Sequence, residues 1–130
     1  RTVTAHRVLV PWTEGNGWTV GGNDRGEGPG ATWTCPTDTD ISDQSPDCPG
    51  SEWSGGAFDP ASGPPVLHTN GLSGEVSFDV TADLAAGAAS GWLVSKDLEG
   101  QNGKVYYYSR EGEAGGASPD SSPRLLLLYN

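Results

Sequence analysis

The sequence predicts an all-β domain, a jelly-roll-like antiparallel β-sandwich with long Gly/Pro-rich loops and at most one short helix. Three observations support this prediction. The 130 residues include 20 glycines and 10 prolines, which interrupt helices wherever they fall. Short segments rich in β-branched and aromatic residues alternate with Gly/Pro turns, as in sandwiches and jelly rolls. Five Trp, four Tyr and two Phe supply large side chains for a core, which argues against disorder.

The N-terminal half contains three predicted strands. Residues 2–10 are rich in β-branched residues and end at Pro11, which indicates a strand. Residues 12–30 are glycine-rich and predict a long loop. A short strand is expected at residues 31–35, and another, with a bulge at Gly55 and Gly56, at residues 52–59.

The C-terminal half begins after the break at residues 64 and 65, both proline. Residues 75–80 alternate, with Val76, Phe78 and Val80 on one face, which predicts a half-buried strand. Residues 81–89 predict one or two helical turns, begun by Thr81 or Asp79 as a cap and ended by Gly87. Further strands are expected at residues 91–95, 104–109 and 124–129. Four consecutive leucines in the last of these are typical of a central strand covered on both faces.

The charge excludes two classes of partner. The formal net charge is −10 and the sequence pI is about 4.3, so nucleic acid and anionic membrane surfaces would repel the chain. Its longest apolar runs fall far short of the roughly 20 residues that a membrane span needs, so no membrane insertion is expected.

The two cysteines, Cys35 and Cys48, flank a loop rich in Pro, Asp, Ser and Thr. A disulfide between them would constrain the unfolded chain by roughly 3 kcal/mol. Zinc needs further ligands, and no histidine lies nearby. We therefore predict a disulfide and an extracellular location, secreted or at a cell surface; a pair of free thiols is the alternative for a cytosolic protein.

Several short motifs together resemble one family. In order they are His6-Arg7-Val8, Pro11-Trp12-Thr13-Glu14-Gly15, Ala31-Thr32-Trp33, Gly55-Gly56-Ala57-Phe58-Asp59, Phe78-Asp79-Val80-Thr81, and Ser118-Pro119 with Ser122-Pro123-Arg124-Leu125. This pattern resembles the DNRLRE domain, which is related to the disaggregatase repeats of archaea and to a family of carbohydrate-binding modules.

The resemblance implies an extracellular jelly-roll sandwich, usually appended to secreted enzymes or large surface proteins. Some relatives bind acidic algal polysaccharide, for which basic residues would be expected, whereas this chain is strongly acidic. The family also begins with further strands upstream of the equivalent of Arg1. We therefore expect residues 1–130 to form a single sandwich domain that is incomplete at its N-terminus relative to the family.

The candidate carbohydrate-binding residues are aromatic, because sugar rings stack on aromatic faces. Trp18 lies in a glycine-rich loop, and Tyr106 and Tyr108 share one face of a predicted strand. That face could equally be an ordinary solvent-facing surface. The other four tryptophans are expected to pack in the core: Trp12, Trp33, Trp53 and Trp92.

The cysteine loop holds the candidate metal ligands Asp38, Asp40, Asp43 and Asp47. An oxygen-rich cluster suits calcium, although the spacing lacks the glycine and terminal glutamate of an EF-hand. A solvated acidic loop is the alternative interpretation. No local catalytic signature surrounds His6 or His68, so no catalytic residue is predicted.

The sequence thus predicts a non-enzymatic extracellular module that binds polysaccharide or glycan-rich surfaces, as in adhesion. Because the chain is acidic, its ligand is expected to be neutral or bridged by calcium. The alternative is a structural subunit of an extracellular filament, appendage or matrix. In that case another polypeptide segment or subunit would complete the sheet by strand complementation.

Overall fold

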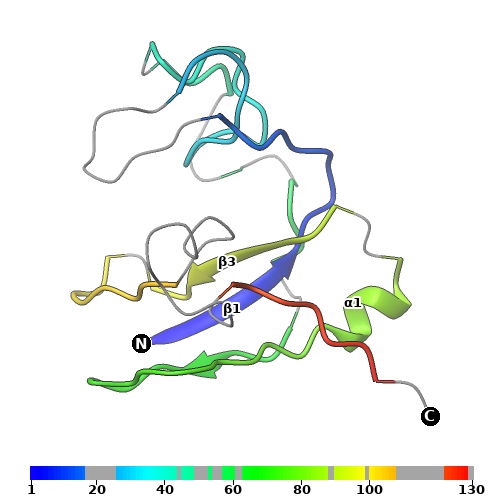
Figure 1. The fold of residues 1–130 in the computed structure, drawn as a ribbon, viewed down its shortest axis with the longest axis vertical. Helices are drawn as coiled ribbons and strands as arrows, with labels where there is room; N and C mark the ends of the chain where they lie inside the picture. Colours follow the sequence, from blue (N-terminus) through cyan, green and yellow to red (C-terminus); the bar gives the residue numbers. More distant parts are fainter. Residues whose placement is uncertain are drawn as a thin grey trace.

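The computed structural model describes residues 1–16, 26–43, 45–48, 53, 57–60, 63–87, 90–98, 100–107 and 122–128. Its regular elements are β1 (Thr2–Arg7), β2 (Val66–Leu67), α1 (Thr81–Ala85) and β3 (Trp92–Lys96). The three strands form one antiparallel sheet in the order β2-β1-β3 (Figure 1). Regular structure is therefore mostly strand with little helix, as the sequence predicts. The second sheet that a sandwich requires is not among the described residues.

Strand β1 is the centre of this sheet. It pairs with β3 from Val3↔Lys96 to Arg7↔Trp92, and with β2 at Thr2↔Leu67 and Val3↔Val66. Val3 and Ala5 are 1% and 2% exposed. On the other face Thr4 is also buried, and its hydroxyl donates a hydrogen bond of 2.7 Å to Asp97 Oδ1. The middle of β1 is thus covered on both faces, which explains its β-branched composition.

A second small core lies where the chain leaves β1. Val8, Trp53 and Ala57 are buried together, and Phe58 and Leu93 pack against them. Val8 forms an antiparallel bridge with Phe58, and the Leu9 N–H donates to the Ala57 carbonyl at 2.8 Å. Of the strand expected at residues 52–59, the described residues 53 and 57–59 show this one bridge, and the expected bulge at Gly55 and Gly56 lies outside the described residues.

Residues 26–43 and 45–48 form what we call the acidic lobe, which lies above the sheet in Figure 1. A bridge between Gly30 and Asp38 and the predicted disulfide between Cys35 and Cys48 hold this lobe together. The disulfide joins Cα atoms 5.4 Å apart, and Cys35 is fully buried. The backbone passes so close to Gly15 that a Cβ at Gly30 would lie 2.7 Å from the Gly15 Cα. No larger residue fits at Gly30 without moving the chain.

The segment before α1 shows the predicted alternation. Val76, Phe78 and Val80 are half-buried, whereas the residues between them are exposed. The segment has no ladder partner among the described strands, so it is extended chain rather than a strand. Asp79 Oδ1 accepts a 3.0 Å hydrogen bond from the Thr81 N–H at the start of α1, and Gly87 follows its end with a φ of 82°. The helix lies within the predicted residues 81–89, and Gly87 follows its C-cap, Ala86, as predicted. Its N-cap is Val80, which makes no side-chain capping bond, so the predicted cap at Thr81 or Asp79 is wrong. The Asp79 carboxylate instead closes a turn just before the helix.

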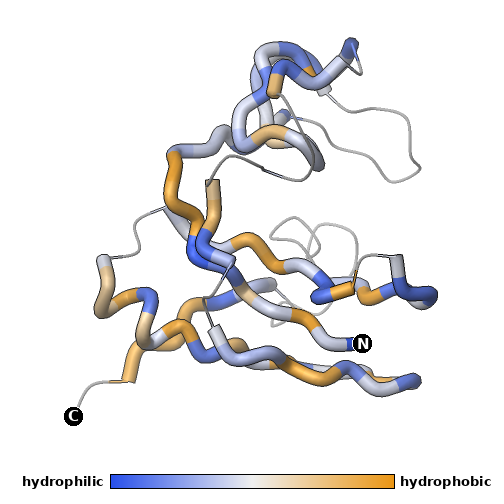
Figure 2. Tube along the Cα trace, turned by 180° about the vertical axis from the view of Figure 1, so that it is seen from behind, coloured by the Kyte–Doolittle hydropathy of each residue, from blue (hydrophilic) through white to orange (hydrophobic). Residues whose placement is uncertain are grey.

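Other expectations for strands are wrong within the described residues. Residues 31–35, 104–107 and 124–128 form no ladder. The leucines at 125–128 are 49–85% exposed, so they do not form a covered central strand. They appear as an apolar segment near the C-terminus in Figure 2. A strand that is apolar on both faces needs cover on both sides of its sheet, and the central position of the described sheet is held by β1. Strand β2 was not predicted, because two residues are too short to show a pattern.

Candidate functional site

The structure places one of the three predicted carbohydrate-binding residues. Tyr106 is 80% exposed and lies on the extended segment after β3. Trp18 and Tyr108 lie outside the described residues. The predicted pairing of Tyr106 with Tyr108 on one face therefore stays a prediction, and Tyr106 carries the candidate site.

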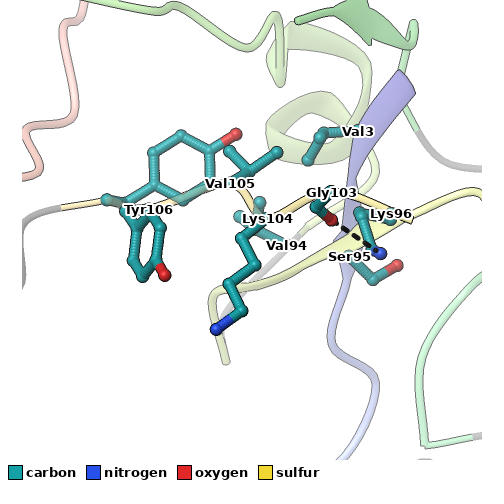
Figure 3. A pocket seen from close by; sticks show the side chains of 9 residues that line it. Val3, Val94, Ser95, Lys96, Gly103, Lys104, Val105 and Tyr106 are labelled. Carbon is teal, nitrogen blue, oxygen red and sulfur yellow. Dashed lines mark hydrogen bonds between the residues drawn. The ribbon is translucent and has the colours of Figure 1, made fainter. Parts of the chain in front are cut away.

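Tyr106 lines a pocket of about 340 Å³ between β3 and the segment that follows it (Figure 3). Val3, Val94 and Val105 contribute apolar side chains to this pocket. Its polar side chains come from Ser95, Lys96, Lys104, Tyr106 and Tyr107. An apolar base with polar groups and an exposed aromatic ring at the rim suits a small ring-shaped ligand.

The pocket gathers both lysines of the chain, which the sequence pattern did not reveal. The Lys96 amine donates to the Gln101 carbonyl at 3.1 Å and to the Gly103 carbonyl at 3.5 Å. Lys104 and Tyr106 are two residues apart, and their side chains extend to the same side of the segment in Figure 3. This alternation was visible in the sequence, but the position of Lys96 depends on its hydrogen bonds to the carbonyls of Gln101 and Gly103.

Tyr107 anchors the segment that carries Tyr106 to His68 and Phe78. Its hydroxyl lies 2.7 Å from His68 Nε2, and its ring packs edge-on against His68 and Phe78. His68 Nδ1 lies 3.1 Å from the Val66 carbonyl, so a ring that donates from Nδ1 accepts the Tyr107 O–H at Nε2. Burial raises the pKa of the Tyr107 hydroxyl, which keeps it a donor. This contact ties the pocket segment to β2.

The four predicted calcium ligands all lie in the acidic lobe, where their side chains accept hydrogen bonds from the lobe itself. Asp38, Asp40 and Asp43 each accept from a backbone N–H two residues further on. Asp47 accepts from the N–H and the hydroxyl of Thr39. These bonds suit carboxylates that stabilise turns.

Two of these carboxyl groups have lowered pKa values. The Ser42 hydroxyl and N–H lower the pKa of Asp40, and the hydroxyl and N–H of Thr39 lower that of Asp47. Asp38 is 2% exposed, whereas Asp40 and Asp43 face solvent. Within the described ranges, no three His, Cys, Asp or Glu side chains are grouped to hold a metal ion. Calcium binding stays a prediction.

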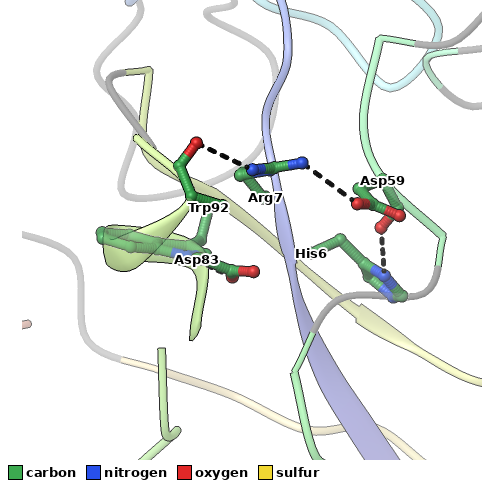
Figure 4. A network of polar contacts seen from close by, with 6 residues as sticks. His6, Arg7, Asp59, Asp83 and Trp92 are labelled. Atoms are coloured by element: carbon green, nitrogen blue, oxygen red, sulfur yellow. Dashed lines mark hydrogen bonds and ion pairs between the residues drawn. The ribbon is translucent and has the colours of Figure 1, made fainter. Parts of the chain in front are cut away.

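A polar network joins α1 to the sheet and to the chain near Phe58 (Figure 4). Arg7 forms a 3.3 Å ion pair with Asp59 and donates to the Ala86 carbonyl at the end of α1. The Trp92 indole N–H donates to Asp83 Oδ2 at 2.8 Å, and Asp83 is 6% exposed. These contacts bind one element to another and have a structural role.

His6 belongs to the same network. Its Nδ1 lies 3.2 Å from the Asp59 carbonyl, and its ring packs against Phe58 with the centroids 5.3 Å apart. Each histidine of the chain is thus bonded to a main-chain carbonyl through Nδ1. This arrangement agrees with the structural role that the sequence predicts for His6.

The tryptophans separate into two groups that the sequence did not distinguish. Trp53 is buried, as predicted. Trp12 is 44% exposed, so its predicted place in the core is wrong, although its indole N–H donates to the Ser90 carbonyl at 2.6 Å. Trp33 is 61% exposed, so its predicted place in the core is wrong. The flanking threonines, Thr32 and Thr34, could have indicated that Trp33 lies in a turn rather than in a core strand, because hydroxyl-bearing residues are common in turns.

We compared the chain with known protein families, curated proteins and solved structures. No family model, curated protein or solved structure matches this chain. No helix in the described part of the chain is long and apolar enough to cross a membrane. The disulfide is compatible with an extracellular location.

Proposed function

We propose that this chain is a non-catalytic extracellular module that binds polysaccharide or glycan-rich surfaces. The observation that carries the proposal is Tyr106, whose ring is 80% exposed at the rim of a 340 Å³ pocket. Its role is to stack on the C–H face of a pyranose ring.

The pocket supplies the two kinds of contact that a sugar needs. Val3, Val94 and Val105 provide apolar surface, while Ser95 and Lys104 provide donors for ring hydroxyls. Tyr107 is held by His68 and Phe78, so the backbone next to Tyr106 is positioned before the ligand arrives. A site fixed in advance loses less entropy on binding.

The net charge favours a neutral polysaccharide as the ligand, and the disulfide favours an extracellular location. A net charge of −10 repels free polyanions over long distances, which favours a neutral polysaccharide. The disulfide favours an oxidising compartment. A secreted or cell-surface module meets polysaccharide in such a compartment.

Affinity electrophoresis tests the proposal. Native gels containing hydroxyethylcellulose, galactomannan, xylan or dextran should retard the wild-type chain in at least one case. Tyr106→Ala should weaken that retardation about tenfold, since losing one stacked ring costs about 1 kcal/mol or more. Tyr106→Phe keeps the ring and should retain most binding. Leu72→Ala, which removes a 47% exposed apolar side chain elsewhere, is the matched control.

The exposed leucines favour a second candidate, a structural subunit of an extracellular assembly. Leu126 and Leu128 are 78% and 85% exposed on a segment that forms no strand within the described residues. Strands β2 and β3 are the two edges of the described sheet. An extended apolar segment beside open edges is what strand complementation uses. Light scattering would then find oligomers that Leu126→Lys disperses; a wild-type monomer would contradict this candidate.

A further inference from the structure

Trp33 is an exposed indole in the most polar part of the molecule. It is 61% exposed, whereas Ile41, the other large apolar residue of the acidic lobe, is 7% exposed. Figure 2 shows the lobe as largely hydrophilic. Trp33 therefore presents a large apolar area to solvent on a largely hydrophilic surface.

The turn that carries Trp33 is fixed by hydrogen bonds on both sides. The Thr32 N–H donates to the Cys35 carbonyl at 2.9 Å, and the Cys35 N–H donates to the Thr32 hydroxyl at 3.1 Å. Buried Trp53 donates its indole N–H to the Thr32 carbonyl and its backbone N–H to the Thr34 carbonyl, at 2.8 and 3.2 Å. The exposed ring therefore sits on an ordered backbone.

The disulfide adds a covalent restraint to this turn. Cys35 is fully buried and joined to Cys48, whose N–H also lies 2.9 Å from the Cys35 sulfur. Binding at Trp33 would thus order little additional backbone, and ordering costs are a large part of what weakens binding.

The surroundings of Trp33 favour a sugar over a protein partner. A protein interface needs a contiguous apolar patch, and the large neighbours of Trp33 in the lobe are polar or buried. A pyranose ring has an apolar C–H face and a rim of hydroxyls. Its face suits the indole, and its rim suits polar groups such as the hydroxyls of Thr32 and Thr34, the sequence neighbours of Trp33.

The negative charge of the acidic lobe favours a neutral sugar over an acidic one. Asp40, Asp43 and Asp47 lie in the lobe that carries the ring. Three carboxylates repel uronic or sulfated sugars, so a neutral residue is favoured.

We propose that Trp33 is a stacking platform for a neutral pyranose ring and forms a second polysaccharide contact, separate from the pocket at Tyr106. This inference rests on the proposed function of the chain as a polysaccharide-binding module. The platform belongs to the acidic lobe and the pocket to the sheet, which are separate parts of the molecule in Figure 1. Two linked contacts bind more tightly than either alone.

Three variants and a control, compared with Tyr106→Ala, test the platform in gels containing hydroxyethylcellulose, galactomannan, xylan or dextran. Trp33→Ala should weaken retardation by the best of these polymers about tenfold, while Trp33→Phe, which keeps a ring, should lose about threefold. The double variant Trp33→Ala with Tyr106→Ala should lose all retardation. Leu72→Ala should match the wild type, and near-ultraviolet circular dichroism should show that every variant is folded.

Fluorescence gives a readout specific to the exposed indole. Acrylamide should quench Trp33 in the free protein, and the retarding polymer should reduce that quenching in the wild type but not in Trp33→Ala.

The outcomes separate this inference from the proposed function. If Tyr106→Ala weakens retardation and Trp33→Ala matches the wild type, the platform is wrong and the pocket stands. If Trp33→Ala alone weakens retardation, the platform stands and the pocket is wrong. If none of the four polymers retards the wild-type chain, both proposals fail.

Discussion

The sheet and the acidic lobe are stabilised in different ways. In the sheet, main-chain pairing joins residues far apart in sequence, such as Val3 with Lys96, and buries Val3 and Ala5. In the lobe, many contacts are local, such as Ser42 with Asp40, and a disulfide joins Cys35 to Cys48. The sheet therefore depends on burial and pairing, whereas the lobe depends on a covalent bond and ionised carboxylates.

This difference has a consequence for each candidate binding residue. Tyr106 is attached to the sheet through Tyr107, His68 and β2, so its position depends on long-range packing. Trp33 is attached to the lobe through Thr32 and Cys35. Treatments that unfold one region first should affect one binding residue first.

The largest expected loss of stability comes from a substitution in the sheet. Val3→Asp places a carboxylate at a 1% exposed position in the strand that pairs with both neighbours. An unpaired buried charge costs several kcal/mol, and we expect a loss of at least about 4 kcal/mol in the free energy of unfolding. Val94→Asp, at a 43% exposed position on β3, is the matched control and should cost about 1 kcal/mol or less. Urea denaturation measures both; equal losses would contradict this account of the sheet.

The next largest loss of stability is expected when the disulfide of the acidic lobe is removed. Replacing Cys35 and Cys48 together by alanine should lower stability by about 3 kcal/mol, because the unfolded loop gains entropy. The amide signals of the lobe should change while those of β1 and β3 keep their positions in NMR spectra. Equal changes in both regions would show that the lobe and sheet unfold as one unit.

A smaller effect is expected where α1 meets the sheet. Asp83→Ala removes the acceptor of the Trp92 indole N–H, which leaves a partly buried donor without its bond. This should cost about 2 kcal/mol in thermal or urea unfolding. Asp83→Asn keeps an acceptor oxygen and should cost less. If the two variants lose equal stability, the hydrogen bond is not what holds α1 there.

The smallest expected loss of stability comes from lowering the pH, which protonates carboxylates of the acidic lobe. The pKa values of Asp40 and Asp47 are lowered by their hydrogen bonds to Ser42 and Thr39. Their contribution to stability is therefore complete above the unfolded pKa of about 4 and is lost as the pH falls through the lower folded pKa. The Ser42 and Thr39 amide signals should shift in that acid range before those of β1. In Asp40→Asn the Ser42 shift should disappear; its persistence would assign the effect to another group.

Local features of the sequence predicted local structure well. The β-branched run after Arg1 is a strand, Gly87 follows the end of the helix, and Val76 alternates with exposed neighbours as expected. The disulfide between Cys35 and Cys48 was also predicted, since no other cysteine competes. Each of these depends on residues close together in the chain or on the absence of an alternative partner.

The predictions that failed all required a distant partner. Trp33 was expected in the core, but burial of a tryptophan depends on which segments pack against it. The leucines at 125–128 were expected between two strands, and the described sheet has β2 and β3 beside β1 instead. The lysine content of the pocket was missed because Lys96 and Lys104 meet across a turn.

By itself, the sequence determined the mostly-β character of the described chain, the disulfide, the place of the one short helix and the acidic charge. These follow from backbone preferences, from cysteine count and from composition, which act without long-range contacts. The tertiary structure alone decided which aromatic rings face solvent, which groups line the pocket and which strand is central. Exposure and proximity depend on contacts between distant segments, and a pattern of residues along one segment does not specify what covers it.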